Sequence, residues 1–79
     1  MRLNVKLFAS LREQTGLSET TVDIEGGVTV LDVWNHATRD QPMPANTLCA
    51  INMSYARPDD TASDGDEIAF FPPVTGGAW

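Results

Sequence analysis

Cysteine is nearly absent from this sequence, since Cys49 is the only one among 79 residues. A single thiol cannot form an internal disulfide, a zinc cage or a Cys-x-x-Cys redox pair, and this usage is typical of a reducing setting. Long apolar runs are also missing, and none approaches the roughly 18 residues of a membrane span. Residues 1–7 alternate between polar and apolar side chains, unlike a signal peptide. We therefore expect a cytoplasmic protein with no membrane partner.

Basic residues are few as well. Five Lys and Arg stand against eleven Asp and Glu, which gives a formal net charge of −6. Nucleic-acid-binding proteins neutralise phosphates with clustered bases, and here no two bases are adjacent, so nucleic acid is a poor partner. Two interpretations of the acidity stay open. It favours encounter with a partner that has a basic surface, or it only keeps a small domain soluble.

Residue types that commonly build active sites are scarce. His36 is the only histidine and falls on the polar face of a predicted helix, while Cys49 falls in an apolar strand, where burial makes a thiol inert. Trp34 stands at helical spacing and is expected in the core. The acidic segment 59–67 lacks the ligand spacing of a calcium loop and is interpreted as a solvated loop. The side chains therefore predict no metal site and no catalytic centre.

What the sequence does contain is a pattern of short strands around one helix. Thr29, with Asp32 three residues later, predicts a helix N-cap with a capping box. The helix is expected to continue to Gln41 and to stop at Pro42 and Pro44. Alternating or short apolar segments predict one helical turn at residues 11–14 and strands at residues 3–7, 20–24, 48–52, 55–56 and 67–71. At this length the pattern indicates one domain of the α+β class, a sheet packed on one main helix.

Side chains of the last predicted strand are expected to alternate between the two faces of the sheet. Ile68 and Phe70 are expected to face the helix, so that Ala69 and Phe71 face outward, and Phe8 has the same outward parity in the first strand. An exposed Phe8/Phe71 patch is therefore our hypothesis for a partner-docking surface. The alternative is that loops cover both rings.

The C-terminal residues 70–79 have a different character. Pro72 and Pro73 end strand pairing and extend the chain, and Gly76 and Gly77 have no side chains, so that a partner can enclose their backbone closely. Such a tail can offer the carboxyl group of a glycine, which adenylation converts into a mixed anhydride that a sulfur nucleophile can attack. The alternative is a frayed C-terminus without function.

Residues 64–77, with the sequence DGDEIAFFPPVTGG, closely resemble the C-terminal signature of the small subunit of molybdopterin synthase. Residues 5–13 are similar to the first strand and following turn of that family, and Ala50-Ile51-Asn52 is similar to its third strand. The family belongs with the ubiquitin-like sulfur carriers, which include the carrier of the thiamine pathway. The resemblance covers nearly the whole chain.

This resemblance implies a β-grasp domain over residues 1–71 and an extended tail over residues 72–79. An enzyme similar to ubiquitin-activating enzymes would adenylate Gly77 with ATP, and a sulfur donor would convert it to a thiocarboxylate. The tail would then enter the large subunit of molybdopterin synthase and give its sulfur to the pyranopterin precursor of the molybdenum cofactor. Gly76 would provide clearance, and the segment Phe71, Pro72, Pro73, Val74 and Thr75 would lie along the partner's groove. The chain would be a cosubstrate that binds no cofactor itself.

The sequence departs from the family pattern after Gly77, because Ala78 and Trp79 follow it. The resemblance implies that a zinc-dependent protease removes these two residues by cleaving between Gly77 and Ala78. Two alternatives stay open: the extension is artificial, or this paralogue binds a partner without transferring sulfur. Other functions also stay open, namely a sulfur carrier for thiamine, cysteine or a specialised metabolite, a ubiquitin-like modifier of proteins, and a plain interaction module.

Overall fold

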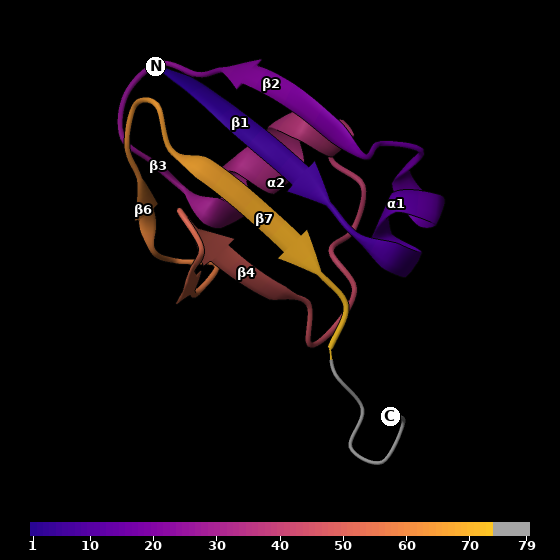
Figure 1. Cartoon of the computed structure of the whole chain (residues 1–79). Coiled ribbons are helices and arrows are strands. Elements are labelled where there is room, and N and C mark those ends of the chain that lie inside the picture. Colours follow the sequence, from indigo (N-terminus) through magenta and orange to yellow (C-terminus); the bar gives the residue numbers. More distant parts are fainter. Residues whose placement is uncertain (74–79) are drawn as a thin grey trace.

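Residues 1–73 are described by the structure, a computed structural model, and form a five-stranded sheet, a two-stranded sheet and two helices (Figure 1). The elements, in chain order, are β1 (Arg2–Leu7), α1 (Ala9–Thr15), β2 (Glu19–Asp23), β3 (Val28–Thr29), α2 (Val30–Thr38), β4 (Leu48–Ile51), β5 (Ser54–Ala56), β6 (Thr61–Ala62) and β7 (Glu67–Phe71). Within this part of the chain, no helix is long and apolar enough to cross a membrane.

The five-stranded sheet has the order β2-β1-β7-β4-β5. β1 and β7 pair in parallel, whereas β1 with β2, β4 with β7 and β4 with β5 pair antiparallel. α2 crosses one face of this sheet (Figure 1). A mixed sheet curled over one main helix is the β-grasp architecture, so the expected α+β class is confirmed. β7 ends at Phe71, but most of residues 72–79 lie outside the described residues, and the division into domain and tail stays a prediction.

The core lies between the sheet and α2. Alternate residues of β1 and β7 are buried, and in β7 Ile68 and Phe70 have no exposed surface. Trp34 of α2 is fully buried as expected, and its ring packs edge-on against Phe70 with centroids 5.1 Å apart. Its indole nitrogen donates a hydrogen bond to the Gln41 carbonyl at 2.7 Å, so that the one polar atom of this side chain is satisfied.

The start of α2 is confirmed, but its expected end is wrong. The Thr29 hydroxyl accepts from the Asp32 backbone N–H, and the Asp32 carboxylate accepts from the Thr29 N–H, which together form the capping box. The helix ends at Thr38, because Arg39 adopts the left-handed conformation (φ 58°) and its N–H closes the last turn on the Asn35 carbonyl. Gln41 therefore lies beyond the helix, where its carbonyl holds Trp34.

The sequence did not predict β3 and β6, which pair Val28 with Ala62 and Thr29 with Thr61. Two-residue strands are too short to show an alternation, so nothing in the local sequence distinguishes them from loop. The acidic segment 59–67 is thus only partly a solvated loop, since Ala62 within it is buried.

Three carboxylates of this segment accept hydrogen bonds from backbone N–H groups. Asp60 accepts a hydrogen bond from the Arg57 N–H at 2.8 Å, and Asp66 accepts one from the Ser63 N–H at 2.8 Å. Asp64 accepts one from the N–H of Arg2 at 2.7 Å. These bonds hold the turns that lead into β6 and β7. In residues 1–73 no group of three His, Cys, Asp or Glu is arranged to hold a metal ion.

The capping box gives a prediction for stability. Thr29→Ala removes the acceptor for the Asp32 N–H, and we expect the free energy of unfolding to fall by about 1 kcal/mol, as measured by urea denaturation. Ser10→Ala, at an exposed position of α1, is the control and should change stability by less than about 0.5 kcal/mol. Equal stabilities of the two variants would show that the capping box does not stabilise the fold.

Candidate docking face and C-terminal tail

One face of the large sheet is turned away from α2, and strand pairing decides which side chains lie on it. Leu48 pairs with Phe71, and Ala50 pairs with both Ala69 and Tyr55, so these residues share a face. Ala69 in turn pairs with Lys6 of β1. Since Ile68 and Phe70 are buried on the other side, the expected outward orientation of Ala69 and Phe71 is confirmed.

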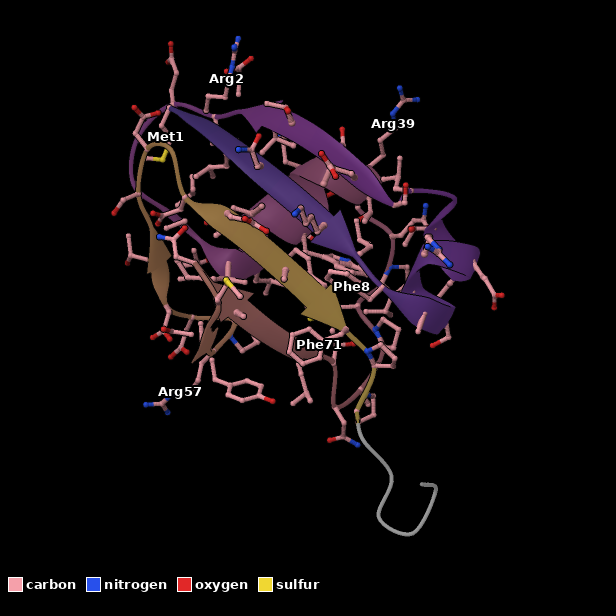
Figure 2. All side chains as sticks on the ribbon, in the orientation of Figure 1. Met1, Arg2, Phe8, Arg39, Arg57 and Phe71 are labelled. Atoms are coloured by element: carbon pink, nitrogen blue, oxygen red, sulfur yellow. The ribbon has the colours of Figure 1, made fainter. Side chains whose placement is uncertain are left out.

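An apolar patch occupies the end of this face where β7 leaves the sheet (Figure 2). Phe8 follows β1 directly, and its N–H donates to the Phe70 carbonyl at 3.1 Å, which brings Phe8 next to Phe71 in the parallel pair. Phe8 is 47% exposed and Phe71 is half-buried, so within the described residues no loop covers the two rings. We call Phe8, Leu48, Tyr55, Ala69 and Phe71 the outer apolar patch.

Sequence reasoning missed two members of this patch, Leu48 and the more exposed Tyr55. Its ring lies 5.9 Å from that of Phe71, measured between centroids, and it is 79% exposed. The signal was present, because residues 55–56 were predicted as a strand, but the parity of a three-residue strand cannot be read without its partner. The pairing of Tyr55 with Ala50 supplies that information.

The rest of the outer face is polar and charged. Lys6 and Glu67 form an ion pair at 3.0 Å, and Glu19 is the register partner of Lys6 on β2. The hydrogen bond and the negative charge of Glu67 raise the pKa of Lys6 above its ordinary value. The outer face therefore has an apolar half over the C-terminal end of β7 and a polar half over β2 and β1.

The tail begins at the apolar end of this face. Pro72 is half-buried, Pro73 is exposed, and neither belongs to a strand. The remaining predicted site residues, Val74, Thr75, Gly76, Gly77 and Ala78, lie outside the described residues. The structure thus brings Phe8, Phe71 and Pro72 to the end of the sheet where β7 finishes, and their role in docking stays a prediction.

The other potentially reactive side chains, Cys49 and His36, are not assembled into a catalytic site within residues 1–73. Cys49 is buried in β4, and burial raises the pKa of its thiol, so the thiol stays protonated. His36 is exposed on α2. A cavity of about 300 Å³ between the α1–β2 connection and the end of α2 is lined mainly by threonine and apolar side chains, with Arg39 as its one charged residue. Within residues 1–73, neither Cys49 nor His36 therefore belongs to a nucleophile–base pair.

A mixed sheet over one helix, an apolar outer patch and a C-terminal strand that leads out beside that patch define a β-grasp domain of the ubiquitin-like class. A family model described as "ThiS family" matches residues 5–77. The chain therefore belongs to the ThiS family.

Curated relatives align with nearly the whole chain. The chain is 37% identical to the molybdopterin synthase sulfur carrier subunit of Escherichia coli, over 95% of this chain and 99% of that protein. It is 34% identical to the protein of the same name from Chlamydomonas reinhardtii, over 98% and 100%. Among solved structures, SAMP1 from Haloferax volcanii superposes with a TM-score of 0.77 at 29% identity, over 98% of this chain and 100% of that one.

The burial of Cys49 gives a prediction for its reactivity. We expect the native chain to react with a thiol reagent such as Ellman's reagent much more slowly than the urea-unfolded chain at the same pH. Burial raises the pKa of the Cys49 thiol in the folded chain above its value in the unfolded chain. The contribution of the neutral thiol to the free energy of unfolding is therefore fully present below the unfolded pKa and is lost as pH rises through the folded pKa. Cys49→Ser is the blank for the absorbance assay. Equal rates for native and unfolded chain would contradict the inert assignment.

Proposed function

We propose that this chain is a sulfur carrier of molybdenum cofactor biosynthesis that works as the small subunit of a molybdopterin synthase. The observation that carries the proposal is the extent of the family match. It runs to residue 77, so it includes Gly76 and Gly77 and ends at the bond before Ala78. Relatives with up to 37% identity over nearly the full chain bear the name of molybdopterin synthase sulfur carrier subunit, which supports the pathway.

The proposed chemistry takes place at the carboxyl group of Gly77. A carboxylate is a poor acyl electrophile and must first be activated. On an adenylyltransferase similar to ubiquitin-activating enzymes, the Gly77 carboxylate attacks the α-phosphate of ATP, and pyrophosphate is released. Hydrosulfide from a sulfur donor then attacks the carbonyl carbon of the acyl adenylate, AMP leaves, the sulfur loses its proton to water, and Gly77 ends as a thiocarboxylate. ATP belongs to the activating partner, and this chain itself binds no cofactor. Gly76, which has no side chain, gives the clearance that a narrow active-site channel requires.

Activation requires a free carboxylate on Gly77, and Ala78 follows it in the sequence. We therefore propose that the Gly77–Ala78 bond is cleaved first, by a metalloprotease that removes Ala78 and Trp79. The family match supports this position, because it stops at the same bond.

The proposed partner in sulfur delivery is the large subunit of molybdopterin synthase. The outer apolar patch lies where the tail begins, so a partner that covers Phe8, Phe71 and Tyr55 is also placed to receive the segment from Pro72 to Thr75. The net charge of −6 favours encounter with a partner of positive surface potential.

A second candidate function is protein modification. It is favoured by one observation, the similarity to small archaeal modifier protein 1 of Haloferax volcanii, which is 32% identical over 91% of this chain and 97% of that one. Gly-Gly remnants on lysines of other proteins in the native cell, found by peptide mass spectrometry, would support this function. A thiocarboxylate form without such remnants supports the carrier function.

The carrier function predicts a specific change of mass. A chain that ends at Gly77, incubated with the activating enzyme, ATP and a sulfur donor, should gain the mass difference between oxygen and sulfur, as measured by intact-mass spectrometry. The same chain without Gly77 and the full-length chain are the controls, and both should keep their mass. Absence of the gain in the Gly77 chain, with the activating enzyme shown to be active on its own carrier, would contradict the carrier function.

The docking hypothesis predicts the effect of a charge in the outer apolar patch. Phe71→Asp should weaken binding to the large subunit by about 2 kcal/mol, or roughly thirtyfold in Kd, measured by calorimetry. Folding should persist, because Phe71 lies outside the buried core. Thr21→Asp, at an exposed position of the edge strand β2, is the matched control and should bind normally. Equal binding of both variants would show that the patch is not the docking surface.

A further inference from the structure

Lysine is almost absent from the chain. Lys6 is the only one, and the other four basic residues are arginines, although lysine is among the commonest residues of soluble proteins. A neutral lysine amine is a nucleophile, whereas the guanidinium of arginine stays protonated at physiological pH and is not one. The chain thus has one side-chain amine that could attack an activated acyl group.

Acidic side chains from both neighbouring strands lie close to the Lys6 amine. Lys6 Nζ is 3.0 Å from Glu67 Oε1, and both side chains are more than half covered, with exposed fractions of 37% and 39%. Glu19 flanks Lys6 from β2 as its register partner. Two carboxylates from the strands on either side therefore favour the ammonium form, and the raised pKa of Lys6 agrees with this geometry. An ammonium group has no lone pair and cannot attack a carbonyl carbon.

Lys6 is also near the start of the tail. It pairs with Ala69, two residues before Phe71, on the strand adjacent to β7. A peptide reaches at most about 3.5 Å per residue, so the covalent length from Phe71 to Gly77 allows about 20 Å. The strand spacing of about 4.8 Å puts Lys6 well inside that length. Groups joined by so short a segment meet at effective concentrations on the order of millimolar.

We propose that the Lys6–Glu67 ion pair protects the chain's only side-chain amine from acylation by its own activated Gly77. The proposal rests on the proposed function, because it requires an acyl adenylate. In the suppressed reaction, the lone pair of neutral Lys6 attacks the Gly77 carbonyl carbon and a C–N bond forms. The bond from that carbon to the phosphate oxygen breaks, AMP leaves with its electron pair, and water takes the proton from nitrogen. The product is an internal isopeptide, which consumes the carrier before sulfur arrives.

The shielding itself is tested without any partner enzyme. The full-length chain and its variants are treated with a small acylating reagent, N-hydroxysuccinimidyl acetate, and acetylation of Lys6 is followed by peptide mass spectrometry against N-α-acetyl-lysine amide as internal standard. Glu67→Gln keeps the size and the hydrogen-bonding oxygen but removes the charge. We expect the reagent to acetylate Lys6 roughly two- to fivefold faster in Glu67→Gln than in the wild-type chain.

Glu19→Gln is the matched control, because it removes one carboxylate beside the same lysine but no direct ion pair. Its rate should rise less than that of Glu67→Gln. A wild-type rate in Glu67→Gln, or an equal rise in both variants, would overturn the role assigned to the ion pair. Circular dichroism of each variant confirms that the fold is kept.

The protective role is tested with the activated tail. Chains that end at Gly77 are incubated with the activating enzyme and ATP but no sulfur donor, and the internal isopeptide is measured as loss of one water from the intact mass. Glu67→Gln should form more of it than the wild-type sequence, and Lys6→Arg should form none at this site. Adenylation of every chain with equal isopeptide in wild type and Glu67→Gln would overturn the protective role. Absence of adenylation in every chain would instead contradict the proposed function, while the acetylation rates still decide the shielding.

Discussion

The parallel pairing of β1 with β7 is the constraint on which the rest of the structure depends. It joins the first strand of the chain to the last described one and aligns Val5 with Ile68 and Leu7 with Phe70. These four side chains are buried under α2, so the register is strongly specified. A slip of one residue would turn Ile68 and Phe70 to the outside and press Glu67 and Phe71 into the core.

The same pairing assembles the outer face. It brings Phe8 beside Phe71 at the end where the tail begins, and it places Lys6 within reach of Glu67. Stability comes from the inner side, where Phe70 packs against Trp34 and the Trp34 indole is held by Gln41. Because the inner side chains carry the packing, the outer ones are free to serve a partner and to control the chain's own amine. Under the proposed carrier function, such a domain needs only to offer its tail to partner enzymes, which supply the catalytic groups.

Much of the fold followed from local patterns. The alternation in residues 3–7 and 67–71 predicted which side chains are buried, and Thr29 with Asp32 predicted the start of α2 because both partners of a capping box lie within one turn. The end of α2 was missed, since a left-handed arginine rather than a glycine stops it at Arg39. β3 and β6 were missed because each has two residues and exists only through the other. Phe8 and Phe71 were found by parity, whereas Tyr55 needed its strand partner.

The sequence by itself determined the covalent chemistry of this protein: a Gly-Gly pair after two prolines, one lysine, one buried-strand cysteine and membership of the ThiS family. The order of residues along the chain is enough to recognise these features, since the family match also rests on the linear sequence of residues 5–77 and on no tertiary contact. Only the tertiary structure decided that β1 runs parallel to β7, that Tyr55 joins Phe71, and that Glu67 rather than another acid pairs with Lys6. Each of these contacts joins residues distant in the chain, and strand register, which local sequence does not encode, sets which of them meet.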